Sequence, residues 1–105
     1  MFNFCAVSGV VCGGLNLYGV GDTDNFITFK LDIRTVIDPA GKIEVICLNR
    51  LALVAAKYLR QGDRVAVVGF LIMNERQSEA GEWHNDAELI AMDLELVKEG
   101  EHTRG

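Results

Sequence analysis

Apolar and polar residues alternate most clearly between residues 25 and 37, NFITFKLDIRTVI. Because successive side chains of a β-strand point to opposite faces, this alternation predicts a strand with one buried face. The two predicted faces are Phe26, Thr28, Lys30 and Asp32 on one side, and Ile27, Phe29, Leu31 and Ile33 on the other. The second face is wholly apolar, so we expect it to point into the core.

Four more segments rich in β-branched and aromatic residues predict strands, over residues 3–11, 42–48, 63–73 and 87–97. Gly9 and Gly69 interrupt two of them, which is typical of a bulge or bend. Turn-forming or polar stretches separate the strands, and these are the loop 12–24, the hairpin turn 38–42 and the connection 74–85 with Gly81 near its tip. The chain is therefore predicted to be mostly strand.

Residues 49–61, NRLALVAAKYLRQ, have the periodicity of a helix. Asn49 suits the N-cap position, and Gly62 suits the position just after the helix, where a left-handed conformation ends it. Spacings of three and four residues predict one apolar face, made of Leu51, Val54, Ala55, Tyr58 and Leu59.

Five strands with one helix between the third and the fourth is the element order of an OB-fold. The predicted fold class is therefore all-β with one helix, a five-stranded Greek-key barrel whose helix closes one end. At 105 residues the chain is long enough for one domain with its own core. We expect that domain to span residues 1–98 and to be followed by a short polar tail, residues 99–105.

The formal net charge of −5 counts against a general polyanion binder, because contacts to phosphate need lysine and arginine. The charge is uneven, however, with nine acidic and three basic residues between residue 75 and the end. The net charge therefore does not exclude a local basic groove formed by the earlier part of the chain.

Cys5, Cys12 and Cys47 form no CxxC pair, so we expect reduced thiols, and metal binding is a weaker alternative. No apolar run reaches the ~18–20 residues that span a bilayer, and no basic residue precedes the apolar N-terminal stretch. We therefore expect a cytoplasmic protein that has no membrane partner and no cofactor.

The run VICLNRLALVAAKYLRQGDRVAVVGFL, residues 45–71, resembles the middle of bacterial single-stranded-DNA-binding proteins. In that family a strand leads into a helix that ends in Tyr-Leu and a basic residue, and a glycine and a further strand follow. NFCAVSGVV and NFITFKLDI resemble the family's first two strands, and AGEWHNDAELIAMDLELV its fifth, with Glu88 at a usual glutamate position. The resemblance implies single-stranded DNA binding by a homodimer or homotetramer, nucleoid-associated, with possible replication or repair partners.

The resemblance also implies where bases should stack on aromatic platforms, and this chain departs from the pattern there. The aligned positions hold Thr35, Val36, Lys42, Leu48 and Arg76, none of which is aromatic. Since stacking gives roughly 1–3 kcal/mol per base, we expect weaker and more salt-sensitive binding than is usual in the family.

Other rings are candidates for stacking. Trp83, in the polar connection before the fifth strand, is the sharpest; the alternatives are that it packs onto the barrel or at a subunit contact. Tyr18, in the first predicted loop, and Phe26, on the outward face of the second strand, are the others. Phe29, Phe70 and Tyr58 are interpreted as core residues.

The best basic set for a phosphate backbone is Lys30, Arg34, Lys42 and Arg76, although each alone is more simply a solvated surface charge. Phe2 and Phe4 flank the first strand, whose outer edge pairs subunits in the resembled family, so we expect them at the oligomer interface.

No catalytic motif is present: there is no GxSxG, no HExxH and no glycine-rich loop that leads into a helix. Asp22 and Asp24 in GVGDTD are interpreted as turn residues, because that run leads into a strand. The sequence favours a non-catalytic strand-binding protein, and the alternative is an OB-fold protein-interaction module, similar to a primosome accessory factor.

Overall fold

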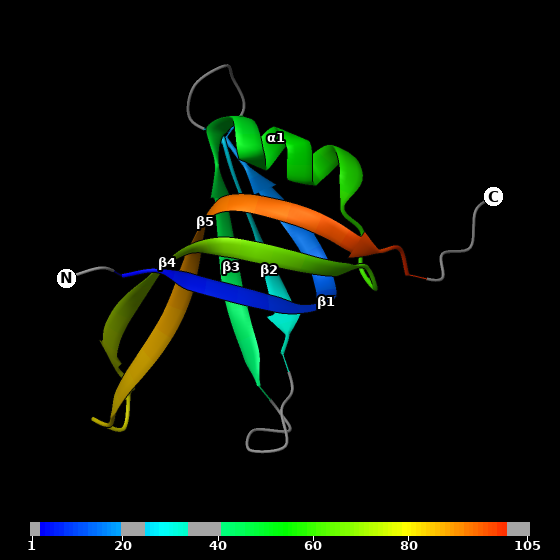
Figure 1. The fold of residues 1–105 in the computed structure, drawn as a ribbon. Coiled ribbons are helices and arrows are strands. Elements are labelled where there is room, and N and C mark those ends of the chain that lie inside the picture. Colours follow the sequence, from blue (N-terminus) through cyan, green and yellow to red (C-terminus); the bar gives the residue numbers. More distant parts are fainter. Residues whose placement is uncertain (1–2, 20–24, 34–40, 101–105) are drawn as a thin grey trace.

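The computed structural model describes residues 3–19, 25–33 and 41–100, and they form a closed five-stranded barrel (Figure 1). Its elements are β1 (Cys5–Tyr18), β2 (Phe26–Asp32), β3 (Lys42–Leu48), α1 (Asn49–Tyr58), β4 (Arg64–Gln77) and β5 (Trp83–Lys98). The order around the barrel is β1-β2-β3-β5-β4, in which β3 and β5 are parallel and the other neighbours antiparallel. The predicted OB-fold is confirmed.

The barrel is filled by the apolar faces of its strands. On β2 the predicted alternation is confirmed: Ile27, Phe29 and Leu31 are buried, whereas Phe26 and Lys30 are exposed. On β3, which has its predicted bounds, Cys47 is wholly buried, and this burial raises the pKa of its thiol to about 12. The Cys47 thiol therefore stays protonated and serves as a small apolar core group.

Three strands run further than predicted. β1 continues to Tyr18 through a register shift between Cys12 and Asn16, so the loop prediction is wrong for residues 12–18. The shift contains Gly13, whose φ of 74° is accessible to glycine at low cost. β4 and β5 extend as an exposed hairpin whose polar residues conceal the strand pattern, and Gly81 lies in its turn as predicted.

The helix is shorter than predicted and starts differently. Asn49 is not the N-cap: its φ is 52°, its backbone N–H donates to the Asn25 carbonyl (2.7 Å), and the N-cap is Leu48 without a side-chain cap. The helix ends at Tyr58, so Gly62, with a φ of 96°, belongs to the following turn. No helix among the described residues is long and apolar enough to cross a membrane.

α1 lies across one end of the barrel, as expected (Figure 1). It buries Ala52, Ala55 and the adjoining Leu59. The predicted apolar face is wrong at Val54 and Tyr58, which are exposed, because the helix contacts the barrel along its row of small residues instead.

Asp63, at the entry to β4, ties three segments together. Its buried carboxylate accepts from the N–H groups of Arg60 and Gly100, each at 2.9 Å. Its carbonyl accepts from the Val11 N–H (2.8 Å). The turn after α1, the middle of β1 and the end of β5 are thereby held at the same place.

At Gly69 the backbone of β4 passes close to that of β5, at a register shift between Val68 and Gly69. A Cβ on Gly69 would lie 1.9 Å from the Ile90 carbonyl oxygen, so Gly69→Ala forces the two backbones apart. We expect it to lower the free energy of unfolding by about 1–3 kcal/mol or more in urea titrations. Gly14→Ala is the control, because nothing lies within 4 Å of its Cβ position. Equal stabilities of the two variants would contradict this view of barrel closure.

Candidate nucleic-acid interface

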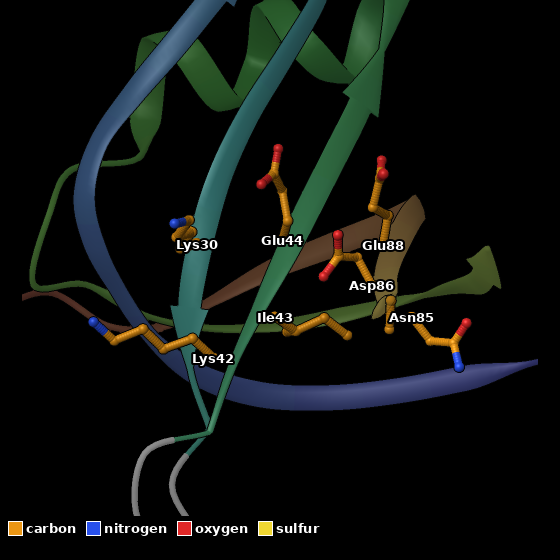
Figure 2. Close-up of a pocket in the computed structure, with 8 residues that line it drawn as sticks. Lys30, Lys42, Ile43, Glu44, Asn85, Asp86 and Glu88 are labelled. Atoms are coloured by element: carbon orange, nitrogen blue, oxygen red, sulfur yellow. The ribbon is translucent and has the colours of Figure 1, made fainter. Parts of the chain in front are cut away.

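A hollow opens where β3 and β5 diverge. The two strands pair only over residues 44–46 and 88–90, and the chain before these residues separates (Figure 2). The gap between the start of β3 and residues 85–88 of β5 has a volume of about 470 Å³. A second hollow of about 320 Å³ lies over the outer faces of β1 and β2.

The two hollows meet at Lys30 and Glu44, which line both. Together they are called here the outer groove. Its lining residues are Cys12, Gly13, Gly14, Asn16, Tyr18, Thr28, Phe29, Lys30, Lys42, Ile43, Glu44, Asn85, Asp86, Ala87 and Glu88. The groove is thus built by four strands, β1, β2, β3 and β5.

Strand register sets the order of charges across the outer groove. Lys30 on β2 is the partner of Glu44 on β3, and Glu44 is in turn the partner of Glu88 on β5. Because paired residues point to the same face of a sheet, these three side chains form one row. The charge along the row changes from positive to negative.

Two of the predicted basic residues, Lys30 and Lys42, line the same hollow and are exposed. Their amino groups lie on one side of it, toward β1 and β2, in Figure 2. The structure therefore brings these two together, as a phosphate-binding role requires. Arg34 lies outside the described residues.

Three carboxylates line that hollow as well, those of Glu44, Asp86 and Glu88. Sequence reasoning missed them as a group. Their meeting depends on the parallel pairing of β3 with β5, two segments far apart in the chain, for which the local pattern carries no signal. Among the described residues, no group of His, Cys, Asp and Glu side chains has the arrangement of a metal site.

Arg76 is on the hairpin of β4 and β5, beyond the lining of the groove. Its Nε lies 2.5 Å from Asp86 Oδ2, and both side chains are largely exposed. The ion pair offsets the positive charge of Arg76, so this arginine is a weaker candidate for phosphate than Lys30 or Lys42.

Tyr18 and Phe26 form a stacked ring pair at the other end of the groove. The ring centroids are 4.8 Å apart with an interplanar angle of 18°, and the two residues are partners in the β1–β2 register. Both residues remain partly exposed, Tyr18 with 47% and Phe26 with 36% of its surface accessible to solvent. The pair therefore offers an aromatic surface where two of the predicted candidates meet.

Trp83 opens β5 next to the hairpin turn and is 68% exposed. The alternative that it packs onto its own barrel is thus wrong, whereas base stacking and a subunit contact remain predictions. The lining of the groove ends at Asn85, so Trp83 lies beyond the hollow along the same hairpin.

Phe4 directly precedes β1 and is 68% exposed. Next to it, the Asn3 amide donates to the Leu71 carbonyl (2.6 Å) and accepts from the Leu71 N–H (3.1 Å), which fixes the segment against β4. Phe70, predicted as core, is 37% exposed, because its position in the β4 alternation points outward. Phe2 lies outside the described residues.

Comparison with known proteins agrees with this architecture. The model of the single-strand binding protein family matches residues 27–97, so the chain belongs to that family. This confirms the resemblance drawn from the sequence. The comparison with curated protein sequences gives no match.

Two solved structures are similar over nearly their whole length. One is a small single-stranded DNA-binding protein from Streptomyces coelicolor, at 21% identity and a TM-score of 0.76, covering 91% of this chain and 95% of that one. The other is Rim1, a mitochondrial single-stranded DNA-binding protein from S. cerevisiae, at 14% identity and a TM-score of 0.78, covering 95% and 99%. At these identities the likeness establishes the fold.

Proposed function

We propose that this protein binds single-stranded DNA in the outer groove, as a homodimer or homotetramer and without catalysis. The observation that carries the proposal is that the segment matched by the family model, residues 27–97, supplies most of a groove whose lining includes Lys30 and Lys42. The two similar structures are both of single-stranded DNA-binding proteins, which supports the same function.

In the proposed mode, the phosphate backbone follows Lys30 and Lys42, and bases stack on the rings of Tyr18 and Phe26. Trp83 and Arg76 extend the contact surface along the hairpin. Phosphate contacts and base–aromatic stacking together are sufficient for strand binding without sequence readout. Three carboxylates in the groove and a net charge of −5 oppose the phosphates, so we expect modest affinity and strong salt dependence.

The proposal predicts a specific change in salt dependence for Lys30→Ala. Fluorescence anisotropy of a labelled single strand, titrated at several salt concentrations, gives the slope of log K against log salt. Loss of one phosphate contact should lower its magnitude by about 0.7 and weaken binding at low salt. Lys57→Ala, on α1 away from the groove, is the matched control. Equal slopes for the two variants would contradict a phosphate contact at Lys30.

The alternative function is a protein-interaction module, and the excess of carboxylates over lysines in the outer groove favours it. The same titration separates the two functions. Wild-type protein that binds no strand even at low salt would leave the protein-interaction module as the better account.

The oligomer part of the proposal rests on β1. Its first residues, from Cys5 to Ser8, pair with β4 on one side, and no described strand pairs with them on the other. An exposed strand edge of this kind is a ready template for pairing with another chain. The apolar and exposed Phe4 beside it fits the centre of a subunit contact.

Phe4→Asp should therefore reduce the molar mass measured by light scattering after size exclusion, because it places a charge in the contact. Leu53→Asp, at an exposed apolar position of α1, is the control and should leave the mass unchanged. A monomeric wild type, or an unchanged mass for Phe4→Asp, would count against pairing at this edge.

A further inference from the structure

The carboxylates of Glu44, Asp86 and Glu88 line the same hollow of the outer groove as the two lysines. In Figure 2 the amino groups of Lys30 and Lys42 lie on one side of the hollow and the carboxylates of Asp86 and Glu88 on the other, with the Glu44 carboxylate between them. The row of strand partners from Lys30 through Glu44 to Glu88 gives the same order.

Neighbouring side chains hold two of these carboxylates in position. The Asn74 amide donates to Glu88 Oε1, and the Arg76 guanidinium donates to Asp86 Oδ2. An ionised carboxylate has two oxygens and about four acceptor positions, so one donor leaves it able to accept more. Because Asn74 is neutral, it orients Glu88 without offsetting its charge.

This arrangement constrains the direction of a bound strand. Phosphates are repelled from the Glu44–Glu88 side and attracted to the lysine side, so the backbone lies along β2 and the start of β3. At the hollow between β3 and β5 the bases then project toward β5, where they meet groups that accept hydrogen bonds and cannot donate them while ionised, whereas bases further along β2 reach the Tyr18–Phe26 pair.

Cytosine and thymine differ in how they meet such a surface. Cytosine presents an N4 amino group, which is the partner that Glu and Asp accept from in nucleic-acid readout. Thymine has the O4 carbonyl at that position, and its single ring N–H lies between two carbonyl oxygens. A carboxylate that approaches thymine therefore faces acceptors, whereas one that approaches cytosine receives a donor.

We propose that the outer groove prefers cytosine over thymine, with Glu88 and Glu44 as the residues that determine this specificity. The inference rests on the proposed strand-binding function and adds base selection to it. A groove that used only stacking and phosphate contacts would be tolerant of sequence, since every base has an aromatic face. The preference is therefore specific to the carboxylate side of this groove.

The test is an anisotropy titration with oligo-dC, oligo-dT and oligo-dU strands of equal length, at low salt and mildly alkaline pH. Oligo-dU lacks the thymine methyl group, so the comparison of dC with dU isolates the amino group from the methyl contact. We expect dC to bind at least about fivefold more tightly than dT and dU, the lower end of the discrimination from a good side-chain contact to a base.

Two variants test whether Glu88 and Glu44 cause the cytosine preference. Glu88→Gln and Glu44→Gln replace an acceptor-only group with an amide that both donates and accepts, so the ratio of dC to dT affinity should fall toward one. Both variants should also bind all strands more tightly, because a negative charge is lost. Glu95→Gln, an exposed residue of β5 outside the groove lining, removes the same charge and should leave the ratio unchanged.

The results of these titrations distinguish a failure of the base preference from a failure of the proposed strand-binding function. Binding of dT or dU as tightly as dC overturns the base preference and leaves strand binding intact. A dC preference that persists in both glutamine variants overturns the assignment to Glu44 and Glu88. No binding to any strand overturns the proposed function, and the inference with it.

Discussion

Closure of a five-stranded barrel within about one hundred residues is the constraint on which the rest of the structure depends. It forces β4 so close to β5 that no side chain fits at Gly69, and β1 so close to the end of β2 that a Cβ on Gly9 would lie 2.6 Å from the Asp32 carbonyl oxygen. Once the strands are held at these distances, their alternation determines which side chains point outward. The outward-facing side chains of β1, β2, β3 and β5 include most of those that line the outer groove.

Much of the architecture follows from local pattern. The alternation in β2 predicted both of its faces, and the strand, helix and glycine order predicted the barrel with its closing helix. The helix start was wrong because asparagine is common both at N-caps and in turns. Asn49 adopts a left-handed conformation and donates its backbone N–H to the Asn25 carbonyl, a contact between segments far apart in the chain. Phe70 and Tyr58 were misplaced because an aromatic residue at an outward position carries the same sequence signal as one in the core.

The candidate site was predicted in its parts more than in its arrangement. Lys30, Tyr18 and Phe26 could be chosen from residue type and strand face, and the structure places Lys30 and Tyr18 in the lining of one groove, with Phe26 stacked on Tyr18. The neighbouring positions of Glu44 and Glu88 could not be predicted in the same way, since they depend on a parallel pairing across the barrel. That pairing changes the picture of the site from a basic track to a groove with one basic and one acidic side, which lowers expected affinity and introduces a basis for selection among bases.

The central claim is that the outer groove receives the strand. The most direct test is the set of amide NMR signals of isotope-labelled protein that shift when an unlabelled single strand is added. The account predicts the largest shifts at Thr28, Lys30, Glu44 and Glu88, together with Tyr18. Shifts confined to α1, or to the outer face of β1 and β4 around Phe4, would contradict it.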